Sequence, residues 1–208
     1  MRIYRDLEQR SDEWHRLRAG VATASNFDKL LTPTGKTSSQ IDAYASQLVA
    51  EHMTGHTISL EQSAWMQRGT ELEPEARAYY ELERDAEVDE VGLILRDDGR
   101  VGCSPDGLVG DEGMVEIKCP APHTHIDYLL SGELPGKYLA QVQGQLWIAE
   151  RQWCDFISYH PDLPVLIVRA ERDEEYIDAL AAATEKLVAT MDARLQTLAE
   201  RGYIEEVA

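Results

Sequence analysis

The sequence predicts an α/β fold in which one central mixed β-sheet is flanked by helices. Three observations lead to this prediction. Apolar residues recur at helical spacing up to about residue 84, and residues 87–96 then alternate in the manner of a strand. Further helices and strands follow in turn. A chain of 208 residues with 43% hydrophobic content can build one compact core, so we expect a single domain over residues 1–208.

The N-terminal part of this domain, residues 1–84, is expected to be helical. Thr23 or Ser25 can cap the second of its helices, because a hydroxyl at this position accepts a hydrogen bond from the first turn. The expected elements are two short helices within 11–31 that break near Gly20, a loop at 32–38, a helix at 41–53 that stops at Gly55, and a long helix at 60–83 with a bend near Gly69 or Pro74.

Residues 85–170 are expected to supply the sheet and the helices that cover it. The sequence Asp97-Asp98-Gly99 is typical of a hairpin turn. The remaining part, residues 171–208, is expected to form one helix whose apolar stripe packs on the core. The expected elements are strands at 87–96, 100–104, 113–119, 153–159 and 165–170, and helices at 122–131, 138–149 and 173–201.

The composition favours a protein of the reducing cytoplasm. No apolar run is long enough to span a bilayer, and the charged N-terminus is unlike a signal peptide. The cysteines Cys103, Cys119 and Cys154 are too few and too widely spaced for a disulfide framework or a zinc site. We therefore expect a cytoplasmic location and no contact with a membrane.

The net charge of −18 argues against a nucleic-acid partner, because DNA-binding proteins usually carry a basic surface. The charge is uneven: residues 1–50 hold seven Lys/Arg and six Asp/Glu, whereas the remainder holds 13 and 32. Basic groups that converge in one cleft, together with bound metal ions, can still attract DNA to an acidic protein. The charge therefore weakens a nucleic-acid hypothesis without excluding it.

The most informative residues are Asp106, Glu116 and Lys118. Glu116 and Lys118 are two residues apart on a predicted strand, so their side chains point to the same side, opposite the apolar residues between them. Charged side chains on the inward face of a core strand are costly unless they are paired or bind a metal. Two simpler interpretations stay open: the Pro-Asp-Gly sequence at 105–107 is typical of a turn, and Glu116 with Lys118 can form an ordinary surface pair.

Asp106 and Glu116 can share one divalent cation. Oxygen ligands with no histidine beside them favour Mg²⁺ or Mn²⁺ over zinc. Mg²⁺ commonly binds through one or two carboxylates plus a substrate phosphate, which suits hydrolysis of a phosphodiester by a metal-bound water. Lys118 can hold and activate such a water, so the pattern indicates a metal-dependent nuclease.

Four motifs resemble, in order, those of the phage lambda exonuclease family, also called YqaJ-type viral recombinases. They are residues 12–25 (DEWHRLRAGVATAS), 104–108 (SPDGL), 116–120 (EIKCP) and 140–143 (AQVQ). The similarity extends from about residue 8 to the last helix. It implies the restriction-endonuclease-like core of the PD-(D/E)xK superfamily, which agrees with the strand order predicted above.

The resemblance implies a role for each residue of the acidic group. Asp106 and Glu116 would be metal ligands together with the backbone carbonyl of Ile117. Lys118 would orient or polarise the attacking water. Glu73 matches a family glutamate near the two metal ions, which would be Mg²⁺ or Mn²⁺. Without the resemblance, Glu73 would be an ordinary residue of a solvated helix face.

The resemblance also implies a phosphate site. Four residues match family positions that hold the 5′-terminal phosphate or the adjacent backbone: Arg18, Ser25, Ser104 and Gln141. An arginine can fork onto a phosphate, and a helix N-terminus capped by Ser25 would offer N–H groups to an anion. Gln141 and Gln145 lie one turn apart, so we expect a polar stripe that faces the cleft.

The loop at 32–38 differs from the family pattern. Relatives carry a basic residue directly after the proline, where this chain has Thr34. Lys36 is the nearest basic residue and is therefore the candidate for DNA contact in this loop.

The resemblance implies a Mg²⁺-dependent 5′-to-3′ exonuclease that digests one strand of double-stranded DNA to 5′-mononucleotides in phage-type recombination. Its substrate would be duplex DNA with 5′-phosphorylated ends. It also implies a ring-shaped homotrimer, a single-strand annealing protein as partner, and a phage or prophage gene expressed in a bacterial host. Two other functions stay open: a structure-specific or restriction-type DNA endonuclease on the same fold, and a catalytically silent acidic binding protein.

Overall fold

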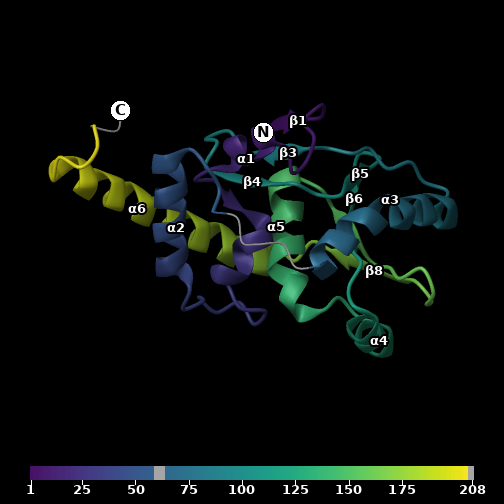
Figure 1. The fold of residues 1–208 in the computed structure, drawn as a ribbon. Helices are drawn as coiled ribbons and strands as arrows, with labels where there is room; N and C mark the ends of the chain where they lie inside the picture. Colours follow the sequence, from purple (N-terminus) through teal and green to yellow (C-terminus); the bar gives the residue numbers. More distant parts are fainter. Residues whose placement is uncertain (59–63, 206–208) are drawn as a thin grey trace.

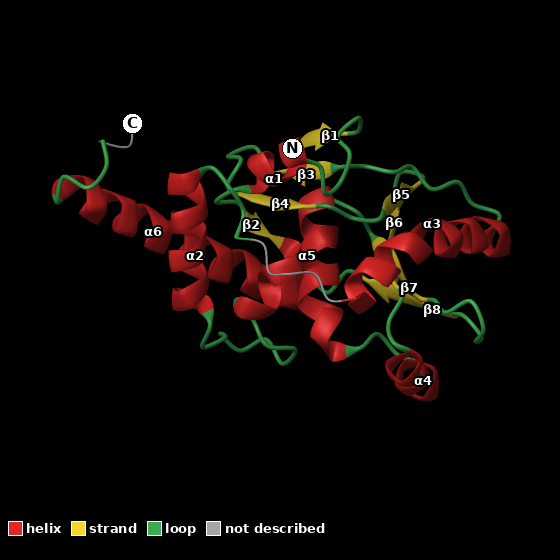
Figure 2. Ribbon diagram, in the orientation of Figure 1, coloured by secondary structure: helices red, strands yellow, loops and turns green. Residues whose placement is uncertain are grey.

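The computed structural model describes residues 1–58 and 64–205, which form two four-stranded β-sheets flanked by helices (Figure 1). The predicted α/β class is confirmed. The strands were expected in one central sheet, whereas the described strands are divided between two. Helix α5 (Leu139–Ala149) lies in the middle of the molecule and contacts strands of both sheets (Figure 2).

The first sheet has the strand order β1-β3-β4-β2. Its strands are β1 (Arg2–Tyr4), β2 (Ala22–Thr23), β3 (Leu93–Leu95) and β4 (Val101–Cys103). β3 is antiparallel to β1 and β4, whereas β2 pairs with β4 in parallel. The strands expected at 87–96 and 100–104 are therefore shorter than predicted. β1 and β2 escaped prediction because two or three residues are too few to show alternation.

The second sheet has the strand order β5-β6-β7-β8. Its strands are β5 (Gly107–Val109), β6 (Gly113–Lys118), β7 (Trp153–Ser158) and β8 (Leu166–Glu171). β6 and β7 are parallel, and β5 and β8 are antiparallel to their neighbours. The chain crosses from the first sheet to the second at residues 104–106. Pro105 has no N–H to offer a ladder, which ends β4, and β5 begins where only a turn was expected.

Helices cover both sheets. Besides α5 they are α1 (Asp12–Arg18), α2 (Ile41–Thr54), α3 (Ala64–Arg84), α4 (Pro122–Ser131) and α6 (Glu174–Glu200), with the 3₁₀ helices η1 (Ala24–Lys29) and η2 (Gly136–Tyr138). The helix expected at 60–83 is α3, and its expected first residues lie outside the described part of the chain. α2 ends at Gly55, whose φ of +70° confirms the predicted stop.

The two N-terminal helices break at Gly20 as predicted, but their caps differ from the prediction. Gly20 has φ +74°, and an added Cβ would lie 2.8 Å from a side-chain atom of α2. The second helix is η1, whose N-cap residue Thr23 makes no side-chain capping hydrogen bond, and Ser25 lies inside the helix. The capping role proposed for these two residues is therefore wrong. Ser11 caps α1 instead, since its Oγ accepts from the N–H of Trp14 at 3.2 Å.

The C-terminal helix α6 packs on the core through one stripe, as predicted. Its buried residues are Tyr176, Ile177, Leu180, Ala183, Thr184, Leu187, Met191 and Leu195. The stripe contacts α2 and α5. Among the helices of the described ranges, none combines the length and the apolar character that a membrane span needs.

Candidate active site

Asp106 stands where the chain crosses from the first sheet to the second. Gln9 holds this crossing in place, because its side-chain amide donates to the carbonyl oxygens of Val91 (2.9 Å) and Pro105 (3.0 Å). The Oδ2 atom of Asp106 accepts a hydrogen bond from the backbone N–H of Ile117 at 2.6 Å. Asp106 directly precedes β5, so its carboxylate adds one further hydrogen bond to β6 before the first residue of β5.

Glu116 lies on the face of β6 that looks toward α5 and is only 1% exposed. Strand alternation places its two neighbours on the other face, in an apolar cluster with α3. The side-chain amide of Gln141 donates to Oε1 of Glu116 at 2.6 Å, and that of Gln145 donates to Oε2 at 2.7 Å. Lys118 donates to Oε1 as well. Both carboxylate oxygens are therefore oriented by neighbouring donors.

Lys118 follows on the same face of β6. Its ammonium lies 5.3 Å from the ring centroid of Tyr138. Burial opposes the charge of Lys118, but the carboxylates of Glu116 and Asp106 outweigh burial and raise its pKa above the ordinary value. The amine is therefore protonated at neutral pH. As an ammonium, it can orient a water or a phosphate oxygen as a hydrogen-bond donor.

A cavity of about 310 Å³ is lined by Asp106, Ile117 and Lys118. The backbone carbonyl of Lys118 accepts from the N–H of Tyr159, which continues from β7, at 2.9 Å. Since successive carbonyls of a strand point to opposite edges, the carbonyl of Ile117 points away from β7 and toward Asp106. The cavity therefore has the carboxylate of Asp106 and the carbonyl oxygen of Ile117 on one side and the ammonium of Lys118 beside them, while Glu116 is buried behind Lys118.

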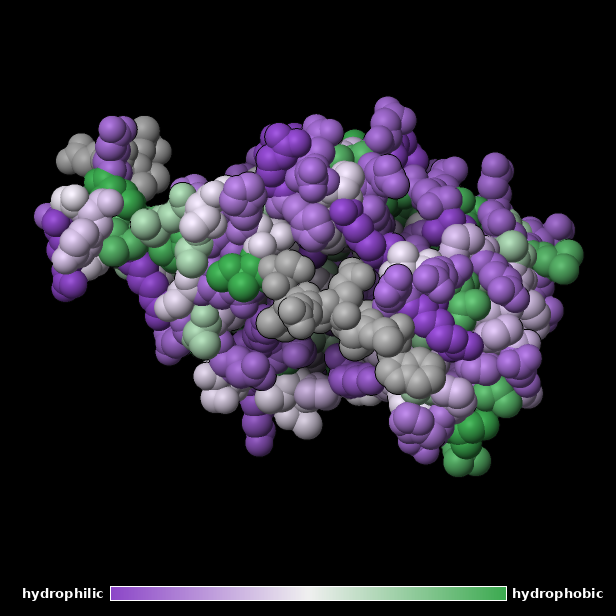
Figure 3. Space-filling view, in the orientation of Figure 1, coloured by the Kyte–Doolittle hydropathy of each residue, from purple (hydrophilic) through white to green (hydrophobic). Residues whose placement is uncertain are grey.

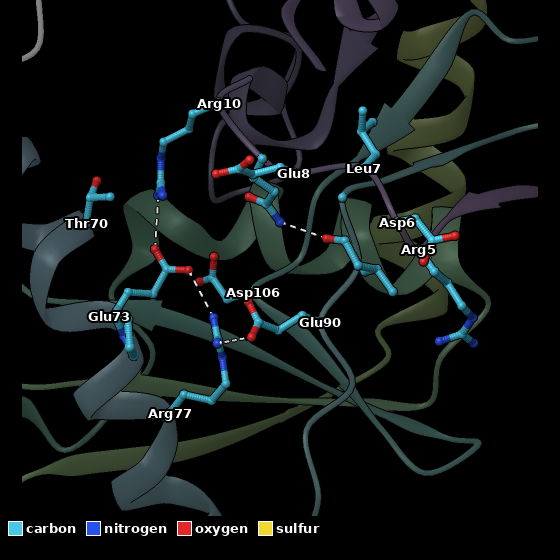
Figure 4. A pocket seen from close by; sticks show the side chains of 14 residues that line it. Arg5, Asp6, Leu7, Glu8, Arg10, Thr70, Glu73, Arg77, Glu90 and Asp106 are labelled. Atoms are coloured by element: carbon cyan, nitrogen blue, oxygen red, sulfur yellow. Dashed lines mark hydrogen bonds and ion pairs between the residues drawn. The ribbon is translucent and has the colours of Figure 1, made fainter. Parts of the chain in front are cut away.

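Glu73 projects from α3 toward Asp106 (Figure 4). Its Oε2 accepts from the guanidinium of Arg10 at 3.0 Å, and its Oε1 accepts from that of Arg77 at 3.3 Å. Arg77 also pairs with Glu90 at 2.5 Å. A second cavity of about 520 Å³ lies here, and Asp106 and Glu73 line both cavities. The structure thus brings Glu73 into the same group as Asp106.

Asp106 forms no salt bridge within the described chain, whereas Glu116 pairs with Lys118 and Glu73 pairs with Arg10 and Arg77. Burial raises the pKa of Asp106 well above its ordinary value, and the carboxylates of Glu116 and Glu73 add to this. Lys118 and the N–H of Ile117 act in the opposite direction and are outweighed. A divalent cation would lower the pKa of Asp106, since it favours the ionised form of every carboxylate around it.

The residues present fit Mg²⁺ better than a fully caged metal. Within the described ranges, no three His, Cys, Asp or Glu side chains are close enough to form a complete ligand set. Asp106, Glu116 and the carbonyl of Ile117 offer hard oxygen atoms. Mg²⁺ usually binds through one or two carboxylates and keeps several waters or substrate oxygens, which is the coordination that this group allows.

A second charged centre surrounds Arg18 at the end of α1. The guanidinium donates to the hydroxyls of Ser104 (3.1 Å), Thr23 (3.3 Å) and Ser25 (3.5 Å). It also stacks on the ring of Trp14, 3.9 Å from the ring centroid. Burial lowers the pKa of Arg18 to about 10. Arg18 has no salt bridge within the described chain, and the three hydroxyls to which it donates are neutral.

A cavity of about 350 Å³ adjoins Arg18 and is also lined by Lys29 of η1. The ammonium of Lys29 lies 4.8 Å from the ring centroid of Tyr44 and, like Arg18, forms no salt bridge with a described residue. Glu51, a carboxylate in the same lining, is already hydrogen-bonded by two backbone N–H groups. The cavity lining therefore holds two cations, Arg18 and Lys29, and one carboxylate, Glu51, an excess of positive charge that suits a phosphate.

Two residues expected at the phosphate site make no contact with Arg18 in the described chain. Gln141 is hydrogen-bonded to Glu116 instead. Lys36 is exposed in its loop, where its backbone N–H donates to a threonine hydroxyl at 3.2 Å. Gln143 belongs to the same motif as Gln141 but points the other way and bonds to the backbone at the start of α6.

Sequence reasoning missed Arg10. It pairs with Glu73 and lines both cavities of the acidic group. A lone arginine before a helix carries no pattern that could have singled it out. Its unusual feature is a φ of +69°, which non-glycine residues rarely adopt and which only the structure reveals.

Residues 13–152 match the sequence profile of the YqaJ-like viral recombinase domain. The crystal structure of an alkaline exonuclease from Laribacter hongkongensis is 39% identical, with a TM-score of 0.84, and the match covers 92% of this chain and 98% of that one. The same protein in complex with dAMP is 38% identical, with a TM-score of 0.83 and the same coverage. These matches confirm the predicted PD-(D/E)xK type of fold.

Two more distant relatives extend the comparison. A phage-related exonuclease from Haemophilus somnus 129PT is 15% identical, with a TM-score of 0.67 over 86% of this chain and 96% of that one, which shows a shared fold alone. An uncharacterised protein of Acanthamoeba polyphaga mimivirus is 25% identical over 170 residues. That match covers 73% of this chain, which spans only 29% of the viral protein.

Proposed function

Because the chain belongs to the YqaJ-like viral recombinase family, we propose that it is a DNA nuclease, and specifically a Mg²⁺-dependent 5′-to-3′ exonuclease of phage-type recombination. It would digest one strand of duplex DNA to 5′-mononucleotides. The observation that carries the proposal is the cavity lined by Asp106, Glu73 and Lys118, where Lys118 also donates to the buried carboxylate of Glu116. The similarity to an enzyme described as an alkaline exonuclease supports the same activity.

Asp106, Glu116 and the carbonyl of Ile117 would hold one Mg²⁺, and Glu73 would contribute to a second ion. Bound Mg²⁺ supplies Lewis acidity and a water of lowered pKa. Gln141 keeps Glu116 aimed at the cavity, which makes it a positioning residue for a metal ligand as well as a neighbour of the substrate path.

Lys118 would act on the attacking water or on a non-bridging phosphate oxygen. Its ammonium is charged and is held beside Glu116, so it can donate a hydrogen bond to an oxygen on which negative charge develops.

Arg18, Ser25 and Ser104 would bind the phosphate at the 5′ end of the DNA strand. A terminal phosphate monoester carries a charge of about −1.5 to −2 at neutral pH, more than an internal phosphodiester. A partly buried arginine without a carboxylate partner suits such a group. Binding the end in this way would set the polarity of digestion, because it places the first scissile bond at the cations.

The release of 5′-mononucleotides is supported by a relative. The alkaline exonuclease of Laribacter hongkongensis was crystallised in complex with dAMP, which is a 5′-mononucleotide. Lys36, in an exposed loop, remains the proposed contact to the DNA flanking the active site.

The proposal includes a homotrimer that encircles DNA and a single-strand annealing protein as partner, both on the family resemblance. Figure 3 shows apolar residues gathered over α4 and over the end of α3, and others toward α2 and α6, on a largely hydrophilic face. Leu130 of α4 and Leu82 of α3 are 81% and 85% exposed, so these sites are uncovered in the single chain. A monomeric mass by light scattering at micromolar concentration would overturn the trimer.

The decisive experiment compares linear duplex DNA bearing 5′-phosphate or 5′-hydroxyl ends with covalently closed circular DNA, each with Mg²⁺ and with EDTA. We expect Mg²⁺-dependent loss of the 5′-phosphorylated linear DNA with mononucleotide products. Cleavage of the circle would instead identify an endonuclease. Absence of any cleavage would identify a silent binding protein.

A further inference from the structure

Arg10 is held in a strained conformation beside the acidic group. Its φ of +69° belongs to the left-handed region, which favours glycine. The residues on either side are anchored: Gln9 bonds to the chain before Asp106, and the hydroxyl of Ser11 caps α1 and donates to the carbonyl of Glu8 at 2.7 Å. Non-glycine residues in such conformations persist chiefly at functional sites.

The side chain of Arg10 has one recorded partner. Its guanidinium donates to Glu73 at 3.0 Å and is 40% exposed. Arg77, the other guanidinium at Glu73, is 13% exposed and also pairs with Glu90. Arg77 is therefore fixed within the protein, whereas Arg10 depends on Glu73 alone among its described neighbours (Figure 4).

Arg10 and a metal ion compete for the same carboxylate. If Glu73 takes part in binding a divalent cation, the cation and the guanidinium repel each other at close range, and Arg10 loses its partner. Arg10 lines the cavity that contains Lys118 and the neighbouring cavity of about 520 Å³, so the released side chain still faces the space where DNA would pass.

From this geometry we infer that Arg10 is a ligand for a phosphate of the DNA strand at the metal centre, and that Glu73 holds it until divalent cations bind. A guanidinium forks onto two phosphate oxygens and is the side chain best suited to this contact. Cation binding at Glu73 releases Arg10 for the phosphate, and phosphate binding by Arg10 frees Glu73 for the cation. Each ligand therefore raises the affinity for the other. This inference rests on the proposed nuclease function and on Glu73 as a metal ligand.

The test uses the full chain in a Lys118→Ala background, so that DNA stays intact in Mg²⁺. In that background, Arg10→Gly removes the side chain and at the same time relieves the positive φ. Its melting temperature should equal or exceed that of the parent, which separates a binding defect from misfolding. Arg5→Gln is the matched control, since Arg5 lines the same large cavity but points away from Glu73 (Figure 4).

Affinity for a 5′-phosphorylated duplex, measured by fluorescence anisotropy at constant ionic strength, should fall about tenfold or more for Arg10→Gly in Mg²⁺. In EDTA, Arg10 remains paired with Glu73, so the loss of DNA affinity caused by Arg10→Gly should be much smaller. Mn²⁺ affinity, measured by calorimetry without DNA, should rise about two- to fivefold, because a competitor for Glu73 has gone. Arg5→Gln should change neither affinity.

Opposite changes in DNA and Mn²⁺ affinity are difficult to produce by a general structural defect. An equal loss of DNA affinity with and without Mg²⁺, or an unchanged or weaker Mn²⁺ affinity, would overturn the inference for Arg10. If the parent protein binds no Mn²⁺ at all, the proposed function itself fails. The two failures are therefore distinguishable in the same set of titrations.

Discussion

The Arg18 site and the Asp106 site lie close together in the chain but differ in the sign of their central charge and in the groups that surround it. Ser104, which contacts Arg18, is only two residues from Asp106 in the chain. Around Arg18 a cation is surrounded by hydroxyls, and burial lowers its pKa to about 10. Around Asp106 carboxylates crowd together, and burial with their repulsion raises the pKa. Neither Arg18 nor Asp106 forms a salt bridge with a described residue.

A third charged residue, Asp155, is fully compensated by its neighbours. Asp155 of β7 is fully buried, yet Arg169 donates to both of its oxygens at 2.8 Å and Tyr80 donates to one of them at 2.8 Å. Nothing is left for a ligand to compensate. The comparison separates Asp155, whose charge is fully paired, from Arg18 and Asp106, which form no salt bridge with a described residue and lie at the two sites proposed to bind a ligand.

The most severe way to break the acidic site is Asp106→Asn. Asparagine can still accept the hydrogen bond from Ile117, but it neither binds Mg²⁺ strongly nor repels Glu116. We expect digestion of linear duplex DNA to fall about a thousandfold or more. In EDTA the melting temperature should rise, because a repelled buried charge has been removed. A lower melting temperature in EDTA would show that the acidic group is balanced without a cation.

Lys118→Ala tests the cation that the acidic site does contain. Turnover should fall about a hundred- to ten-thousandfold, because the donor to the developing charge is lost. Binding of 5′-phosphorylated duplex should change little, which anisotropy in the presence of Mg²⁺ would show. A parallel collapse of binding would mean that Lys118 anchors DNA rather than assisting the chemical step.

Arg18→Ala tests the basic site. We expect a loss of about ten- to a hundredfold in kcat/KM on 5′-phosphorylated ends, since a charged hydrogen bond to phosphate is removed. Ends with a 5′-hydroxyl should lose far less. Arg16→Ala is the control, because Arg16 lies on the same helix and is exposed. Equal losses on both kinds of end would contradict a role in end recognition.

The smallest expected effect sharpens the comparison within one helix. Gln145 and Gln143 are both buried on α5, but Gln145 bonds to Glu116 and Gln143 bonds to the backbone near α6. Gln145→Ala should weaken Mn²⁺ binding about tenfold by calorimetry, because a metal ligand loses its orienting partner. Gln143→Ala should lower stability by about 1–3 kcal/mol and leave Mn²⁺ affinity unchanged. Similar Mn²⁺ affinities in the two variants would refute the orienting role of Gln145.

The sequence drew attention to Asp106, Glu116 and Lys118, which the structure brings close together, but it did not reveal most of their surroundings. Asp106, Glu116 and Lys118 are visible because a strand period and a turn tripeptide fix where they point. The division into two sheets was missed, since β1, β2 and β5 are too short to show a period. No local pattern shows which distant side chain will meet a helix, so the pairing of Arg10 with Glu73 could come only from the folded chain.

The phosphate site shows the same limit. The family pattern grouped Gln141 with Arg18, yet Gln141 contacts Glu116. Helical spacing indicates that Gln141 and Gln145 share a face, but it does not say which charge that face meets. The overall charge of −18 was equally uninformative, because the basic groups at Arg18 and Lys29 are few and local.

The position of Asp106 at the crossing between the sheets has a mechanical consequence. One candidate ligand, Asp106, lies in the segment that connects the two sheets, whereas the other, Glu116, lies on β6 of the second sheet. A cation bound by both residues would link the connecting segment to the second sheet. A movement of one sheet relative to the other would therefore disrupt the metal site before either sheet unfolded. Nuclease activity should therefore be lost at a lower temperature than secondary structure. Bound Mg²⁺ should reduce the difference between these two temperatures.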